Sequence, residues 1–199
     1  FGPMPGARQS LPQKPAWDSL VPFYTTGQFA KMNAKTYRQH CGPTAITNVL
    51  FALDEKAVAE GKDNGIPAIH GRKPEEVFCQ VAGIGQKILL YWNVNILNFF
   101  GGTNQWFAHL YLRACLRSFG LKNIRSFFVP FTSAGHAVKE LEKGRLLMLQ
   151  LYRHPIYGSH LLIACSLVRL QAADGRVRTY LKLADGWSKN PRYLALEDI

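Results

Sequence analysis

The chain has 199 residues, of which 47% are hydrophobic, enough for one globular domain with a full-sized core. Its four cysteines include no Cys-x-x-Cys pair, which argues against a zinc ribbon or a thioredoxin-type site, and no apolar run is long enough to span a membrane. The net charge of +11 favours acidic partners, although nucleic acid is not expected among them, because the basic residues are scattered and no RNA-binding aromatic motif accompanies them.

Five prolines lie in the first 22 residues, and each one fixes φ and removes a backbone donor. We therefore predict an extended, proline-rich N-terminal arm over residues 1–24, followed by a single domain over residues 25–199. Trp17 and Phe23 are candidates to pin the arm to that domain. The alternative for the arm is a disordered leader remnant.

A polar, basic segment then gives way to an apolar one at Cys41. Gly42 allows a tight turn, and Pro43 is tolerated in a first helical turn, where its missing N–H has no partner anyway. Apolar residues follow at helical spacing until Gly61 closes the segment. The pattern predicts a buried helix that begins at Cys41 and ends near Glu60.

Three further helices are predicted. Pro74 followed by Glu75 and Glu76 is typical of a first helical turn, and that helix should run to about Ala82. Gly83 and Gly85 should interrupt it before a second apolar segment continues to about Trp92. The other two helices are predicted over 103–117 and 133–143. Thr103 and Ser133 are their candidate caps, and Gly120 and Gly144 lie just beyond their ends.

From residue 123 onward the periodicity becomes that of strands. Branched and aromatic residues predict a first strand over 124–129. Further strands, mostly antiparallel, are predicted over 145–151, 160–170, 176–184 and 192–196. Helices first and a sheet second indicate an α+β fold.

Its place at the start of a buried helix makes Cys41 a candidate nucleophile. The partial positive charge at a helix N-terminus favours thiolate over thiol, and the thiolate is the reactive form. The alternative is packing, because free cysteines are commonly small buried hydrophobes. Cys79, Cys115 and Cys165 sit inside apolar segments and are interpreted that way, whereas the residues around Cys41 favour catalysis.

The stretch Cys41-Gly42-Pro43-Thr44-Ala45, followed by an apolar helix, resembles the nucleophile motif of papain-like cysteine peptidases, above all the bacterial bacteriocin-processing peptidases that cleave double-glycine leaders. In that family the cysteine opens a helix, a histidine follows much later at the start of a strand, and an aspartate lies on the neighbouring strand. The segments 159–162 and 184–187 are similar to those sites, but residues 54–145 show little resemblance. The resemblance implies a papain-like fold, with the nucleophile helix packed on a C-terminal antiparallel sheet.

A cysteine nucleophile needs an imidazole within hydrogen-bond reach, and the imidazole needs a group that orients it. Among six histidines we choose His160, because it opens a strand behind the flexible Gly158-Ser159 and is therefore held firmly yet reachable. His154, which precedes Pro155 in the loop before that strand, is the rival. A purely structural histidine is the alternative interpretation.

Asp185 is the predicted orienter, and this prediction depends on strand register. A two-residue turn at Asp174-Gly175 would set Asp185 opposite Ala164, about 13 Å from His160 at ~3.3 Å per residue. A four-residue loop, or a bulge with the same effect, sets Asp185 directly opposite His160, close enough for a carboxylate–imidazole bond. We predict the longer loop. Asn190 is the fallback orienter, and a plain turn residue is the alternative for Asp185.

Acyl transfer also needs hydrogen-bond donors aimed at the developing negative charge. The Cys41 backbone N–H is one donor, and the resemblance implies a side chain upstream, usually a glutamine about six residues before the cysteine. Lys35 stands at that position, so we choose Gln39 for the oxyanion site, with Asn33 and Gln28 further away.

Two departures weaken the link to the leader-peptidase subfamily more than they weaken the mechanism. His40 stands where those peptidases favour an acid, and Gly186 stands where they favour a proline. Trp187 and Tyr157 are the candidate substrate-binding residues, although large aromatic residues more often fill cores.

These residues predict a cysteine peptidase or amidase with a Cys41-His160-Asp185 triad and a thioester intermediate. Two alternatives stay open: an acyltransferase or transglutaminase-like enzyme on the same fold, and a non-catalytic basic binding module. We expect a peptide or protein substrate of acidic character, and neither a metal nor a cofactor. A thiolate enzyme fits the reducing cytoplasm, or a secreted location if a leader has been removed.

Overall fold

The structure, a computed structural model, describes residues 8–9, 17–32, 40–96, 100–130, 132–171 and 175–198. It has an α+β fold, as predicted, in which the α-helices precede four of the five strands of the main antiparallel sheet along the chain. The helices are α1 (Thr26–Met32), α2 (Cys41–Ala59), α3 (Pro74–Lys87), α4 (Ala108–Ser118) and α5 (Ala134–Glu142). The strands are β1 (Arg8–Gln9), β2 (Tyr91–Ile96), β3 (Phe100–Thr103), β4 (Leu147–His154), β5 (Gly158–Gln171), β6 (Val177–Ala184) and β7 (Arg192–Ala195).

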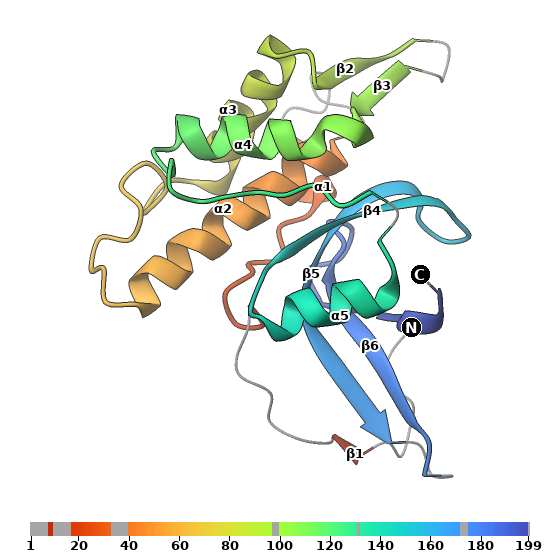
Figure 1. Ribbon diagram of the computed structural model, residues 1–199. Coiled ribbons are helices and arrows are strands. Elements are labelled where there is room, and N and C mark those ends of the chain that lie inside the picture. The colour runs from red at the N-terminus through yellow and green to blue at the C-terminus, as the bar shows by residue number, and fades with distance from the viewer. Residues whose placement is uncertain are drawn as a thin grey trace.

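Helix α2 lies between the other N-terminal helices and the sheet (Figure 1). It begins at Cys41 and ends one residue before Glu60, which confirms the predicted helix. Ile46 and Leu50 are fully buried against α3 and α4, while Ala45 and Val49 on the other side face β5. Burying one Ile or Leu side chain contributes about 1.5–3 kcal/mol, so α2 is held from both sides.

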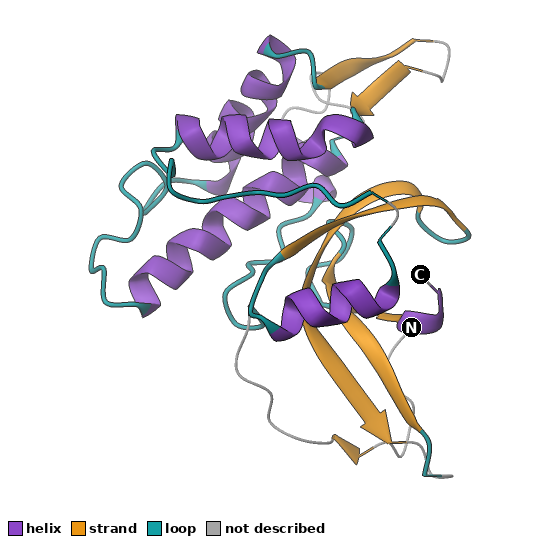
Figure 2. Ribbon diagram, viewed as in Figure 1, coloured by secondary structure: helices purple, strands orange, loops and turns teal. Residues whose placement is uncertain are grey.

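The main sheet has the order β1-β5-β6-β7, and β4 also pairs with β5. Every pairing is antiparallel, and α5 covers the face of the sheet that is turned away from α2 (Figure 2). Successive side chains of a strand point to opposite faces. On β5, Leu161 and Ile163 therefore pack toward α2, and Leu162 and Ala164 pack toward α5.

Helix α3 corrects one prediction, because it continues through both glycines that were expected to interrupt it. Tertiary packing explains why. A Cβ on Gly85 would lie 2.4 Å from the ring of Tyr111, so the glycine allows α3 and α4 to approach closely. The Tyr111 hydroxyl donates to the Val81 carbonyl at 2.8 Å, which joins the same two helices.

The hairpin of β2 and β3 was not predicted, because its run of aromatic and Asn residues lacks a clear strand period. It takes Thr103, the expected helix cap, into β3. The helix predicted over 103–117 instead starts with a 3₁₀ turn, Gln105–Phe107, and continues as α4. Gly120 follows α4 with φ +79°, as a glycine beyond a helix end commonly does.

The strand predicted over 124–129 is also wrong, since these residues pair with no strand of the described chain. They run back along α4 instead (Figure 1), where the Arg113 side chain donates to the Ser126 carbonyl at 3.1 Å. The next prediction holds: Ser133 caps α5, and its Oγ accepts from the His136 N–H.

Most of the N-terminal arm lies outside the described residues. Its described parts contact the domain: β1 pairs with the end of β5, and Trp17 is buried with its Nε1 donating to the Gly144 carbonyl at 3.0 Å. Phe23 packs against the core that α2 shares with β5. None of the described helices is long and apolar enough to cross a membrane.

Candidate functional site

Cys41 opens α2, and its half-buried side chain packs against the core shared with β5. Burial raises the pKa of the Cys41 thiol, and hydrogen bonds from the backbones of Leu161, Gly42 and Cys41 itself lower it by less. The predicted preference for thiolate is therefore wrong for this structure. The helix N-terminus does act in the expected direction, but the loss of water around the sulfur is the larger effect.

Two residues of the motif, Gly42 and Thr44, pack α2 against its neighbours. A Cβ on Gly42 would lie 1.9 Å from Oγ1 of Thr103 at the end of β3, so no larger residue fits there without movement. The Thr44 methyl lies on the other side, where a Cβ on Gly186 would meet it at 3.3 Å. The sequence around Cys41 thus has a packing role as well as a chemical one.

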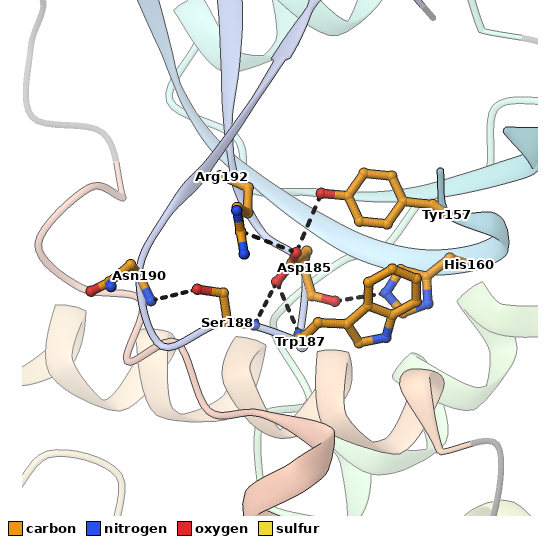
Figure 3. Close-up of polar contacts among 7 residues, drawn as sticks. All are labelled: Tyr157, His160, Asp185, Trp187, Ser188, Asn190 and Arg192. Atoms are coloured by element: carbon orange, nitrogen blue, oxygen red, sulfur yellow. Dashed lines mark hydrogen bonds and ion pairs between the residues drawn. The ribbon is translucent and has the colours of Figure 1, made fainter. Parts of the chain in front are cut away.

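His160 lies near the start of β5 and is almost fully buried. Its Nε2 lies 2.6 Å from the main-chain carbonyl oxygen of Asp185 (Figure 3). A carbonyl oxygen can only accept, so Nε2 carries the proton and the neutral ring keeps a lone pair on Nδ1. Burial lowers the pKa of His160, and the hydrogen bond and charge of Asp185 oppose that shift. The ring is therefore a neutral base near pH 7.

Two aromatic side chains flank this imidazole. The Tyr157 ring is stacked with the His160 ring at a centroid distance of 5.7 Å and an interplanar angle of 6°. The Trp187 ring lies 4.5 Å from the His160 ring, although the indole itself is 51% exposed (Figure 3). These contacts restrict rotation of the imidazole.

The Asp185 carboxylate, although buried, does not contact His160. Its Oδ1 accepts from the backbone N–H groups of Trp187 at 2.9 Å and Ser188 at 3.0 Å, and its Oδ2 accepts from the Tyr157 hydroxyl at 3.3 Å. The Arg192 guanidinium lies 4.0 Å from Oδ2. The carboxylate thus fixes the turn after β6, and that turn presents the Asp185 carbonyl to the imidazole.

The predicted register, with Asp185 directly opposite His160, is wrong. Gln171 pairs with Val177 across the loop, a bulge lies between Ala164 and Ser166, and the last pair is Ile163 with Ala184. Asp185 thus lies just beyond β6, and the register extended by one pair would set it opposite Leu162. The causes are the loop, in which five residues (172–176), neither two nor four, separate the paired strands, and the bulge, which shifts the register by one further residue.

Three elements meet at the N-terminus of α2. The Leu161 backbone is among the groups that lower the pKa of the Cys41 thiol, so the sulfur lies near the chain directly after His160. The loop that holds Asp185 lies close to the first turn of α2, since a Cβ added to Gly186 would lie 3.3 Å from the Thr44 methyl. No hydrogen bond joins Cys41 Sγ to the His160 ring in the described chain, and catalytic hydrogen bonds are often long in free enzymes and tighten on substrate binding.

A surface groove of about 400 Å³ lies beside this site, lined by Thr25, Gly27, Gln28, Trp187 and Lys189. Trp187, predicted to bind substrate, is thus a groove residue. Gln28, a distant alternative for the oxyanion site, also lines the groove, and its Nε2 donates to Glu75 of α3 at 3.5 Å.

Several residues predicted to belong to the site either lie outside the described chain or have a different role. Gln39, the chosen oxyanion donor, lies outside the described residues, as do Lys35 and Asn33. Tyr157 stacks on His160 and does not line the groove. Two alternatives stabilise turns instead: His154 Nδ1 accepts from the N–H groups of residues 156 and 157, and the Asn190 N–H donates to Ser188 Oγ.

Sequence reasoning missed Thr103, Ser188 and Arg192. A signal existed for Ser188, because an aspartate followed by turn residues often accepts from backbone N–H groups two and three positions later. No comparable signal marked Thr103, whose contact with Gly42 depends on an unpredicted hairpin. Among the described residues, no group of three or more His, Cys, Asp and Glu side chains could hold a metal ion.

The chain was compared with family models, with curated proteins and with solved structures. None of the three comparisons gave a significant match.

Proposed function

We propose that this protein is a papain-like cysteine hydrolase that cleaves peptide or amide bonds. Cys41 is the nucleophile, His160 the general base, and the main-chain carbonyl of Asp185 orients the imidazole. The observation that carries this proposal is the hydrogen bond from His160 Nε2 to Asp185. It leaves Nδ1 free to accept a proton next to the chain segment that contacts the Cys41 thiol.

The chemistry follows from the protonation states of the two groups. Burial raises the pKa of Cys41 and lowers that of His160, so the resting pair is a neutral thiol and a neutral imidazole. His160 Nδ1 takes the thiol proton as the sulfur attacks the carbonyl carbon. It then gives that proton to the leaving amine as the C–N bond breaks, and a thioester remains. Water, deprotonated by the same imidazole, hydrolyses the thioester.

The groove supports a peptide substrate of acidic character. The half-exposed Trp187 ring offers an apolar surface beside His160, and Lys189 supplies a cation on the same groove. The overall charge of +11 favours the approach of an acidic chain. Because Trp187 contacts both the imidazole and the groove, a bound peptide would lie close to the base.

A peptide-library cleavage screen tests the proposal. The wild-type protein should release fragments from some members of the library, and Cys41→Ala should release none. Cys79→Ala is the matched control, because Cys79 is also half-buried but lies on α3. An added amine that captures the acyl group faster than water would indicate the acyltransferase alternative. Cleavage that persists in Cys41→Ala would contradict the proposal.

One observation favours a second function, a non-catalytic binding module. The Cys41 thiol is buried enough to raise its pKa, and no hydrogen bond joins it to an imidazole in the described chain. A binding module would bind the same peptides with equal affinity in wild type and Cys41→Ala and would cleave none of them. Binding and cleavage measured on one peptide therefore separate the two functions.

A further inference from the structure

Four cations share one surface pocket on the helical side of the molecule. Arg113 and Arg117 of α4, together with Lys122 and Arg125 beyond it, line a pocket of about 250 Å³, and no acidic residue of the described chain lines it with them. None of the four forms an ion pair with a carboxylate of the described chain, whereas other basic residues do, such as Lys143 and Arg145 with Glu140. Like charges held together repel, so this pocket favours an anionic partner.

The segment that follows α4 is fixed against the helix. The Arg113 side chain donates to the Ser126 carbonyl, Ser126 Oγ donates to the His109 carbonyl at 3.4 Å, and the Phe128 ring stacks on His109 at 5.1 Å. Figure 1 shows this segment running back along α4 toward the sheet. The segment that carries Lys122, Arg125 and Phe127 is thus held against α4, which carries Arg113 and Arg117.

Apolar side chains protrude beside these cations. Phe127, which lines the basic pocket, is 72% exposed, and Ile124 of the same pocket is also exposed. Trp106, near the other end of α4, is 59% exposed and contacts Phe128 edge-on at 6.4 Å. Exposed apolar side chains gathered on one surface mark a site of interaction with a protein or a membrane.

We propose that this surface, formed by α4 and residues 122–128, binds the headgroup region of an anionic phospholipid bilayer. The phosphate of one headgroup occupies the basic pocket, and Phe127 and Trp106 enter the interface between headgroups and acyl chains. Stable peripheral binding needs two signals, and basic residues beside inserted aromatic residues supply both.

Two features favour a bilayer over an acidic peptide or a nucleic acid. The apolar side chains project outward, as insertion requires, whereas a peptide groove would bury them along its walls. The pocket is also smaller than the roughly 300–1,000 Å³ of typical organic-ligand sites, so it suits a single headgroup. This surface is separate from the groove beside Trp187, and the proposal does not depend on Cys41 chemistry.

Co-sedimentation with vesicles of phosphatidylcholine alone, or with 30% phosphatidylglycerol, tests the proposal with the whole chain. Wild type should partition at least tenfold more strongly onto the anionic vesicles in about 0.1 M salt, and less in 0.5 M salt. Replacing all four cations, R113Q/R117Q/K122Q/R125Q, should reduce that partitioning at least tenfold. Phe127→Ser, which keeps the charge, should reduce it at least threefold.

The matched control removes four exposed cations from elsewhere, K62Q/K87Q/K139Q/R178Q, and should stay within threefold of wild type. Equal loss in this control would overturn the proposal, because general charge would then explain binding. Equal partitioning onto neutral and anionic vesicles would overturn it too. So would binding of poly-glutamate or poly-uridine through the four cations without vesicle binding, because the partner would then be a peptide or RNA. Wild-type partitioning and its salt dependence test the proposal even if a variant does not fold.

Discussion

His160 Nε2 donates to the main-chain carbonyl of Asp185 at 2.6 Å, while the carboxylate of the same aspartate accepts from the backbone of its own turn and from Tyr157. One residue thus orients the imidazole through its backbone and shapes that backbone through its side chain. The orientation of His160 depends on the turn that the carboxylate holds, and only indirectly on the carboxylate's charge.

This arrangement predicts different outcomes for two substitutions at Asp185. Asp185→Asn keeps an oxygen that can accept from Trp187 and Ser188, so kcat/KM should fall by less than about tenfold. Asp185→Ala removes that acceptor and loosens the turn, so the loss should exceed about 100-fold. Steady-state kinetics on one peptide substrate measures both. A loss near 10⁴-fold in Asp185→Asn, as when a direct triad carboxylate becomes an amide, would show that the carboxylate itself orients the base.

The protonation states predict a broad pH profile. Burial lowers the pKa of His160 from its ordinary value of 6.5, so kcat/KM should fall only below pH 6.5, where the base becomes protonated. The thiol has a raised pKa, so its ionisation should affect kcat/KM only above pH 9. A kcat/KM profile that rises with a midpoint above pH 6.5 would contradict the neutral pair. Wild type and Trp187→Phe, which keeps an aromatic ring over the imidazole, should give similar profiles.

Two buried histidines predict loss of stability in acid. Burial is the largest cause that lowers the pKa of both His40 and His160, so the folded state favours their neutral forms. The stability that these groups contribute is complete above the unfolded pKa of about 6.5 and is lost as pH falls below it through the lower folded values. Urea unfolding between pH 8 and pH 5 should show this decline. The double variant His40→Gln/His160→Gln should show a shallower one, and an unchanged slope would refute the assignment.

The contact between Gly42 and Thr103 predicts a stability difference between matched glycine substitutions. Gly42→Ala should destabilise by about 1–3 kcal/mol, since its Cβ would overlap the Thr103 side chain. Adding Thr103→Gly should recover part of that loss. Gly83→Ala is the control, because it lies within α3 with no atom within 4 Å of its Cβ, and it should stabilise by up to about 1 kcal/mol. Equal effects at residues 42 and 83 by urea unfolding would contradict the packing.

Local signals in the sequence were sufficient to predict α2 and α5. Gly42 and Pro43 indicated the start of α2, and Ser133 indicated the cap of α5, because each acts within a few residues of the chain. Long-range contacts explain what could not be predicted. Helix α3 continues through Gly85 because Tyr111, 26 positions later, packs against it.

The candidate site shows the same division between local and long-range effects. The sequence placed Cys41 at a helix start and His160 near the start of a strand, and both positions are confirmed. The register between β5 and β6 depended on a loop length and a bulge that composition does not fix. The part played by the Asp185 carbonyl follows from that register. The sequence could therefore not predict that Asp185 orients His160 through its main-chain carbonyl, even though Asp185 itself was chosen as the orienter.

Acylation of Cys41 is the most direct test of the proposed hydrolase. The wild-type protein, mixed with a set of activated peptide esters at neutral pH, should gain one acyl group, which peptide mapping places on Cys41. His160→Gln should slow this acylation at least 100-fold, and Cys115 and Cys165, whose pKa values burial raises, should remain unmodified. Acyl groups spread over several cysteines, or a rate that His160→Gln leaves unchanged, would contradict a nucleophile and base formed by these two residues.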